Sequence, residues 1–172
     1  MSERVPAPGD LALIEALVNT LDIEAGTDEL DTADGRARFG LAEGETESAR
    51  ELRESLRATL LAHAGHPPHR ETTPLGELLA RAPLLVAIDP QDGSAHIRPA
   101  DGDPLLSRVA SAIARSLAEG TWPRLKACEA PTCHWAYYDR SPAGRGRWCS
   151  MAVCGARAKM RTYRARQAGE AS

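Results

Sequence analysis

The chain has 172 residues, of which 42% are hydrophobic and 26% charged, and its formal net charge is −3. This length allows one main domain with a small module attached, and it excludes two large domains. The longest apolar stretches, such as residues 84–88, are too short to cross a bilayer, and the N-terminal residues lack the pattern of a signal peptide. We therefore expect a cytoplasmic protein without membrane contact.

The net charge is divided unequally along the chain. Residues 121–172 hold ten Lys or Arg against three Asp or Glu, a net charge of +7, whereas residues 1–120 carry −10. An acidic body joined to a basic tail indicates that the tail meets a polyanion while the body has another task.

The first two helices are predicted from apolar periodicity. Asp10 is expected to cap a helix with apolar residues at spacings of three and four. These residues are Leu11, Ile14, Val18 and Leu21. Residues 24–47 predict mostly loop, with a short strand over 36–41. Ser48 and Glu51 match a capping box at the start of the second helix. The leucine stripe of that helix is Leu52, Leu56 and Leu60.

Four further segments complete the body. A Thr-Pro pair at the start of residues 73–81 predicts the cap and first turn of a short helix. Residues 84–88 and 94–98, separated by turn-forming residues, predict two strands of a small hairpin. An Asp-Pro pair, with Asp as the cap, opens the last body helix, which is expected over residues 103–120.

The last quarter of the chain holds four cysteines in the pattern C-x4-C-x15-C-x4-C. They are Cys128, Cys133, Cys149 and Cys154. They could form two disulfides in an exported protein or remain buried thiols, but without an export signal a metal is favoured. Four thiolates in two short pairs fill the tetrahedral corners around zinc and leave no open position, so we expect one structural Zn²⁺.

The segments around the cysteines predict a treble-clef-like finger. The pattern predicts a strand over residues 134–138, a turn over 141–146 and the returning strand over 147–148. Ser150 is a good N-cap for a helix to about residue 167, whose first turn brings in the last cysteine. The whole chain is therefore expected to be α+β, with a mainly helical N-terminal body, a small β-hairpin and a C-terminal zinc finger.

The final helix is predicted to have an apolar face that packs and a basic face that does not. The apolar face holds Val153, Ala156, Met160 and Tyr163. The basic face holds Arg157, Arg161 and Arg164, with Lys159 and Arg166 elsewhere on the surface. Residues 140–166 contain eight positive residues and no acid, whereas solvated faces normally mix signs, so nucleic-acid contact is favoured over a plain solvated face.

Other candidate sites have weaker patterns. Trp135, Tyr137, Tyr138 and Trp148 could stack on bases, but next to zinc such residues more often form a small core. His63, His66 and His69 recur at a spacing of three, yet two prolines interrupt any helix that would align them, so a second metal site is not favoured. Asn19 and Thr20 could line an effector pocket, although polar residues at helix ends are more often local caps.

Residues 149–159 (CSMAVCGARAK), preceded by Cys128, Cys133 and the segment 138–141, resemble the CGNR zinc finger over roughly residues 125–166. Residues 17–20 (LVNT) are similar to the start of the ABATE domain, which commonly precedes this finger. The resemblance implies a bacterial stress-induced transcription regulator with zinc on the four cysteines. It divides the chain into an ABATE-like domain (1–121), the finger (122–168) and a tail (169–172). The family motif has Asn where this chain has Ala156.

The leading hypothesis is a DNA-binding regulator at the nucleoid, whose acidic body senses a small-molecule effector or forms a homodimer. The principal DNA contacts would be Arg157, Arg161 and Arg164, and further phosphate contacts would come from Lys159, Arg166, Arg145 and Arg147. A zinc-stabilised protein-interaction or RNA-binding module is the alternative. No nucleophile motif, phosphate-binding glycine loop or open metal site is recognisable, so we do not expect an enzyme.

Overall fold

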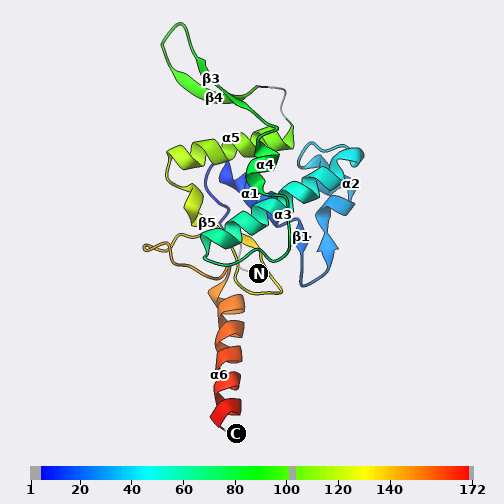
Figure 1. Ribbon diagram of the computed structural model, residues 1–172, viewed down its shortest axis with the longest axis vertical. Helices are drawn as coiled ribbons and strands as arrows, with labels where there is room; N and C mark the ends of the chain where they lie inside the picture. The colour runs from blue at the N-terminus through cyan, green and yellow to red at the C-terminus, as the bar shows by residue number, and fades with distance from the viewer. Residues whose placement is uncertain (1–4, 101–103, 171–172) are drawn as a thin grey trace.

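The computed structural model describes residues 5–100 and 104–170. It has the expected α+β architecture, with a helical body, a β-hairpin that projects at one end and a helix that projects at the other (Figure 1). The α-helices are α1 (Leu11–Val18), α2 (Ala33–Ala37), α3 (Thr46–His63), α4 (Leu75–Leu79), α5 (Leu105–Ala118) and α6 (Ala156–Glu170). Antiparallel two-stranded sheets are formed by β1 (Leu21–Asp22) with β2 (Thr27–Asp28), β3 (Leu84–Ile88) with β4 (Ala95–Pro99), and β5 (Leu125–Ala127) with β6 (Ala136–Tyr138).

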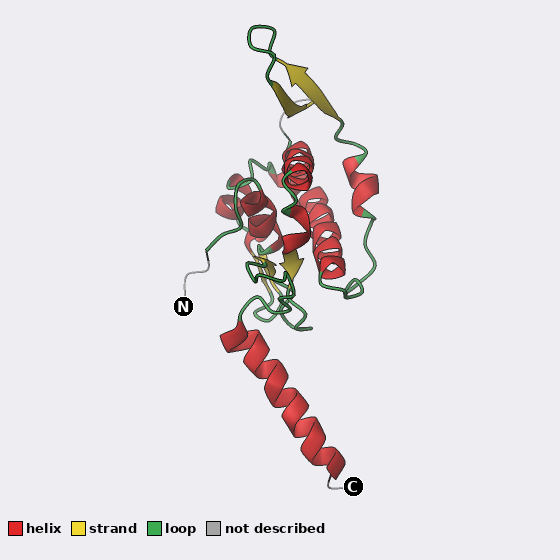
Figure 2. Ribbon diagram, turned by 90° about the vertical axis from the view of Figure 1, so that its left-hand side faces the viewer, coloured by secondary structure: helices red, strands yellow, loops and turns green. Residues whose placement is uncertain are grey.

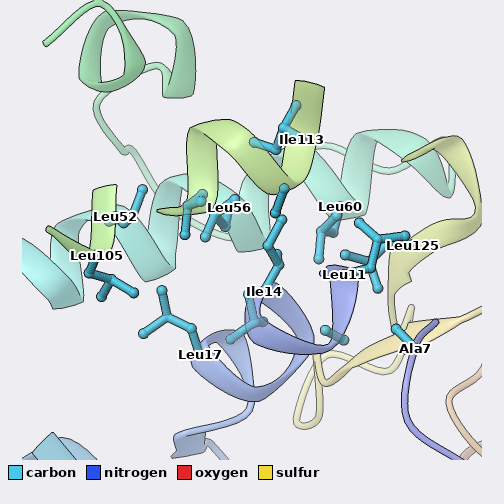
Figure 3. Close-up of a cluster of buried hydrophobic side chains, with 14 of the residues drawn as sticks. Ala7, Leu11, Ile14, Leu17, Leu52, Leu56, Leu60, Leu105, Ile113 and Leu125 are labelled. Atoms are coloured by element: carbon cyan, nitrogen blue, oxygen red, sulfur yellow. The ribbon is translucent and has the colours of Figure 1, made fainter. Parts of the chain in front are cut away.

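One hydrophobic core joins the body to the segment that carries the cysteines. α1 and α3 supply side chains with no solvent exposure, namely Ile14, Leu17, Leu56 and Leu60 (Figure 3), and α5 supplies Val109, which has no exposure either. Leu125 of β5 and Ala136 of β6 are equally inaccessible and belong to the same cluster. The first strands of the finger are therefore part of the core of the body.

The first two predicted helices are confirmed, but their caps differ from the prediction, and α1 ends at Val18, so that Leu21 lies in β1 instead of the helix. Asp10 makes no side-chain cap, because its carboxylate pairs with Arg115 Nη1 at 2.8 Å. α3 begins at Thr46, two residues before Ser48, so the predicted capping box does not form. The carboxylate of Glu45 instead accepts the backbone N–H of Ala42 at 2.8 Å, in the short 3₁₀ turn that leads into α3.

The strand predicted over residues 36–41 is wrong, because this segment begins within the short helix α2. Thr32 Oγ1 accepts the N–H of Gly35 at 3.0 Å and so caps the helix. A Cβ at Gly35 would lie 1.9 Å from the carbonyl oxygen of Glu29, so the turn admits only glycine. The chain folds back closely here to bury Phe39, and an extended strand would leave Phe39 without that cover.

The β3–β4 hairpin and the two helices that flank it are confirmed with small shifts in their ends. α4 begins at Leu75, and the hydroxyl of Thr73 donates to Glu51 at 2.6 Å instead of capping the helix. α5 begins at Leu105 directly after Pro104. The cap predicted at Asp103 lies outside the described residues.

A network of buried charges, which periodicity did not indicate, holds α3 against the end of α1. Arg57 has no exposure and pairs with Glu54 at 2.6 Å, while its second terminal nitrogen donates to the Val18 carbonyl at 2.7 Å. Arg53 joins Glu54 to Asp28 with contacts of 2.8 and 2.7 Å. Burial alone would raise the pKa of Glu54, but hydrogen bonds from His69 and the charge of Arg57 lower it well below its usual range.

We predict that Arg57→Leu destabilises the protein by about 3–5 kcal/mol, because it removes the guanidinium that contacts both carboxylate oxygens of the buried Glu54. Since the pKa of Glu54 is lowered on folding, its contribution is complete above the unfolded pKa and is lost as the pH falls through the folded pKa. Urea unfolding of both proteins from neutral to acidic pH should show the difference shrinking at low pH. Arg38→Leu, which breaks an exposed pair with Glu29, is the control and should cost at most about 1 kcal/mol. An equal loss in the two variants would contradict the prediction.

Candidate zinc and nucleic-acid site

The four cysteines converge from three connected segments of the finger. Cys128 follows β5, Cys133 lies in the turn before β6, Cys149 ends the long loop and Cys154 lies in the turn that opens into α6. Their sulfur atoms all lie within 4.8 Å of one another. The Sγ of Cys149 is 3.6 Å from that of Cys133 and 3.8 Å from that of Cys154.

These sulfur positions fit a tetrahedral zinc ion. With Zn–S bonds of about 2.3 Å, tetrahedral geometry requires sulfur–sulfur distances of roughly 3.8 Å. Cys128 and Cys154 are buried and the other two are half-buried, so protein surrounds the cluster on most sides. The site is suited to one structural zinc ion that takes all four ligands from the chain.

A tight turn places the first cysteine pair. The backbone N–H groups of Cys133 and His134 both donate to the Ala130 carbonyl, at 2.9 and 3.3 Å. His134 adopts a left-handed conformation with φ of 49°, and its Nδ1 lies 3.0 Å from the carbonyl oxygen of Cys128. Burial lowers the pKa of His134. The side chain of His134 therefore closes the turn and links Cys128 to Cys133.

The second cysteine pair depends on the predicted cap at Ser150, which is confirmed. Its Oγ accepts the N–H of Val153 at 3.3 Å, at the start of a π-helical turn over Met151–Gly155 that carries Cys154. A Cβ at Gly155 would lie 3.0 Å from the sulfur of Met151 and 3.2 Å from the ring of Trp148. The close approach explains a small residue directly after the last ligand.

The hairpin predicted between the two cysteine pairs is wrong in its second strand. β6 does form, over the last three residues of the predicted strand 134–138, but it pairs with β5 and not with residues 147–148. The register pairs Ala127 with Ala136, and both alanines are buried in the core. Burial of this small pair against the body selects β5 as the partner, which spacing within the finger alone could not indicate.

A buried ion pair organises the loop that residues 147–148 were expected to close. Lys126 Nζ lies 2.9 Å from the carboxylate of Asp139. The same carboxylate accepts the N–H groups of Gly146 at 2.7 Å and Ser141 at 3.0 Å. Burial raises the pKa of Asp139, but the bond from Lys126 and these loop donors outweigh it and lower the pKa. Arg124 adds hydrogen bonds to the carbonyls of Asp139 and Ser141 at 3.1 and 2.8 Å.

Of the two residues predicted to line an effector pocket, Asn19 joins the body to the finger. The side-chain amide of Asn19 donates to the Ala136 carbonyl at 3.0 Å and accepts the Ala136 N–H at 2.7 Å. The hydroxyl of Thr20 donates to the Leu17 carbonyl at 2.8 Å and accepts from Arg53 at 3.1 Å. The polar atoms of both residues are thus occupied by protein groups, and a ligand role for them has no support from these contacts.

The three histidines make separate contacts with no common ligand position. His63 Nδ1 lies 2.8 Å from the Leu125 carbonyl, and burial lowers its pKa. His66 lies 3.4 Å from Glu129, and His69 lies 3.0 Å from Glu54. Among the described residues, the cysteine cluster is the one group of three or more ligating side chains. His63 and His66 therefore link the body to the finger, whereas the contact of His69 with Glu54 lies within the body.

The apolar face predicted for the last helix does not pack, which corrects the expectation from periodicity. α6 extends away from the body (Figure 2), and Val153, Met160 and Tyr163 are 46%, 50% and 57% exposed. Ala156 is exposed as well. No element of the described part of the chain covers this face. The apolar residues of the finger lie instead around the cysteines or in the core of the body.

The seven predicted nucleic-acid contacts are all exposed and fall into two groups. Arg157 pairs with Glu24 of the body at 2.8 Å, and Arg147 pairs with Glu129 and lies 5.3 Å above the Trp148 ring. The other five side chains form no ion pair within the described residues. They are Arg145, Lys159, Arg161, Arg164 and Arg166.

The aromatic residues of the finger are mostly packed, as predicted. Tyr137 is buried beside the cysteines, and its hydroxyl donates to the Gly146 carbonyl at 2.8 Å. Burial raises the pKa of Tyr137. Trp135, Tyr138 and Trp148 are half-buried. The guanidinium carbon of Arg140 lies 5.2 Å from the ring centroid of Tyr138. The same guanidinium donates to the carbonyls of Val5 and Pro6.

We predict that Cys154→Ser abolishes zinc binding, because three thiolates remain and the turn before α6 loses its anchor. Native mass spectrometry should report one zinc ion per wild-type chain and none in the variant, and trypsin should cleave residues 140–166 faster. Val153→Ser changes the exposed neighbouring position and is the matched control. Retention of one zinc ion with unchanged trypsin resistance in Cys154→Ser would rule out the proposed ligand set.

The comparisons with known proteins agree with this arrangement. The model of the CGNR zinc finger matches residues 124–167, and a model described as "Putative stress-induced transcription regulator" (ABATE) matches residues 10–120. No curated protein matches the chain significantly. None of the helices in the described residues is long and apolar enough to span a membrane. Both families are of regulatory or zinc-finger type. The chain belongs to the ABATE family, as a zinc-containing regulator with a C-terminal CGNR zinc finger.

Proposed function

We propose that this regulator binds DNA through α6 and the loop that precedes it. The observation that carries the proposal is a free-standing helix (Figure 2) with exposed arginines at its surface and the four-cysteine cluster at its base. A helix of this diameter fits the major groove of B-DNA, where arginine side chains reach base edges and phosphates. Such a regulator would act at the bacterial nucleoid.

The charges along α6 suit a phosphate backbone. Arg161 and Arg164 lie three residues apart and therefore share a face, and neither has a carboxylate partner in the described structure. Lys159, Arg166 and Arg145 add positive charge at other positions. If about four to six phosphates are engaged, the logarithm of affinity should fall with the logarithm of salt concentration at a slope of about −4 to −5.

Base-specific reading is a separate matter from phosphate contact. Ala156 stands where the family motif has Asn, and its side chain can form no hydrogen bond with a base. Specificity would then come from the arginines and from DNA shape.

We place the effector site of the body in an apolar pocket between α3, α4 and α5. Its volume is about 160 Å³, which suits a ligand of about the size of benzene. Leu52, Leu78 and Leu105 line it. Its polar residues are Glu45, Ser48, Glu51 and Arg81. Native mass spectrometry of freshly purified protein should detect a retained small molecule. If neither small aromatic acids nor small aromatic amines bind the purified protein, this assignment is wrong.

A protein-interaction or RNA-binding module is the second candidate, and the exposed Met160 and Tyr163 favour it. On a helix that binds only phosphates, large apolar side chains have no evident task. The double variant Met160→Ala and Tyr163→Ala should weaken binding of a protein partner more than binding of DNA. Arginine substitutions should do the reverse.

We predict that the double variant Arg161→Gln and Arg164→Gln weakens DNA binding and makes the salt slope shallower by about 2, since two phosphate contacts are lost. Fluorescence anisotropy with a labelled duplex at several salt concentrations measures both effects. Arg98→Gln, an exposed arginine on β4 at the other end of the molecule, is the matched control and should leave both unchanged. If the wild-type protein shows no salt-sensitive binding to any duplex or single strand, the proposal fails.

Glu24→Gln should strengthen DNA binding, because Arg157 is released from its carboxylate partner and one repulsive charge is removed. The expected gain is roughly two- to fivefold, the range of an exposed ion pair. The same titration tests it, with Glu29→Gln, which breaks a similar exposed pair with Arg38, as the control. A weaker affinity in Glu24→Gln would mean that the ion pair orients α6 for binding.

A further inference from the structure

We propose that β3 pairs antiparallel with β3 of a second copy of this chain, so that the two hairpins form one four-stranded sheet. The proposal goes beyond DNA binding and does not depend on it. The hairpin projects from the body at the end opposite α6 (Figure 1), and its apolar residues Val86 and Ile88 are 71% and 60% exposed. A two-stranded hairpin in water is marginal, so a further strand on its free edge would stabilise it.

One face of the hairpin is wholly apolar. The register pairs Leu84 with Pro99, Val86 with Ile97 and Ile88 with Ala95. Residues directly opposite in an antiparallel pair project to the same face. These six side chains therefore form a continuous apolar surface, of which only part lies against the last turn of α5. Pairing along β3 would join this surface to that of the second copy in one four-stranded sheet.

The free edge of β3 offers unpaired backbone groups. The bonds from Asp89 N to Ser94 O at 2.8 Å and from Ala100 N to Pro83 O at 3.0 Å fix which pairs exchange hydrogen bonds. By alternation, the N–H and C=O groups of Leu84, Val86 and Ile88 point away from β4. Three donors and three acceptors are thus directed outward on one strand.

The two edges of the hairpin differ in what protects them. β3 reads Leu-Leu-Val-Ala-Ile and has neither charge nor proline, whereas β4 contains His96, Arg98 and Pro99. Charged residues and proline on an edge strand are the usual means by which proteins prevent such pairing, and Pro99 offers no N–H. The unprotected edge is β3, which makes it the edge for association.

Charge complementarity identifies the occupant as a second copy. A two-fold axis at Val86 pairs Leu84 with Ile88 of the other copy and brings its turn, with Asp89 and Asp92, alongside the segment that holds Arg81. Arg81 is exposed and forms no ion pair within the described structure. Symmetry repeats this match of an acidic turn with an arginine at the other end of the new sheet, so β3 is complementary to itself.

The test is the mass of the full-length, zinc-loaded protein in solution without nucleic acid, by light scattering after size-exclusion chromatography. The wild type should show twice the chain mass of 18.4 kDa. Val86→Pro removes an outward N–H that β4 does not use, and it should give a folded monomer. Ala95→Pro, which removes the outward N–H of an exposed residue on β4, is the matched control and should remain dimeric.

A cross-link keeps the proposal testable if proline disturbs the hairpin. At the two-fold axis the paired Cα atoms lie about 5.5 Å apart, within the range for a disulfide. Val86→Cys should therefore form a covalent dimer under mild oxidation, whereas Ala95→Cys should not. A monomeric wild type, loss of the dimer in both proline variants, or equal cross-linking of the two cysteine variants would overturn the proposal. Loss of DNA binding in the α6 variants would leave the dimer intact, so the two proposals fail separately.

Discussion

Burial of β5 against α3 is the interaction on which the arrangement of this protein depends. Leu125 and Ala127 have no exposure and pack with the leucines of the body, and β6 follows through its pairing with β5. Cys128 continues directly from this strand, so the first zinc ligand starts from a position that the body fixes. A zinc ion bound by the four cysteines would couple that position to the other ligands and to the base of α6. The core thus positions β5, β5 positions the cysteines, and the cysteines position the base of α6.

Polar contacts fix the same junction in direction, where hydrophobic packing alone would allow sliding. Asn19 satisfies both backbone groups of Ala136 at the outer edge of β6. His63 reaches the carbonyl of Leu125 on the neighbouring strand. Arg57, with no exposure, ties α3 to the last carbonyl of α1, the helix that Asn19 ends. Each of these groups lies in or near the core and makes at least one hydrogen bond there, although the Nε of Arg57 has no partner within the described structure.

Local patterns predicted the elements whose signals are local. The leucine stripe of α3, the spacing of the cysteines and the cap at Ser150 each follow from a few neighbouring residues. The errors occur where a partner far along the chain decides the outcome. Residues 36–41 have strand-like composition but fold to bury Phe39. β6 pairs with β5 because both strands pack on the body.

The uncovered face of α6 was predicted to pack, and the burial of Arg57 was not predicted at all, for a second reason. A stripe of apolar residues predicts a packed face only if another element is available to cover it, and arginine is ordinarily read as a surface residue. Sequence periodicity contains no information on either point. The outward charges of α6 could be predicted because one-sided composition over residues 140–166 needs no partner to be recognised.

The burial of Leu125 also limits how this finger can be reused. A segment cut at residues 124–167 would carry away Leu125, Ala127 and Ala136 with their cover removed, and its own cluster, Cys128, Ala130, Tyr137 and Cys154, is small. Such a fragment would present to water the surface that α1 and α3 now cover. Transfer of this finger to another protein would therefore need those two helices as well.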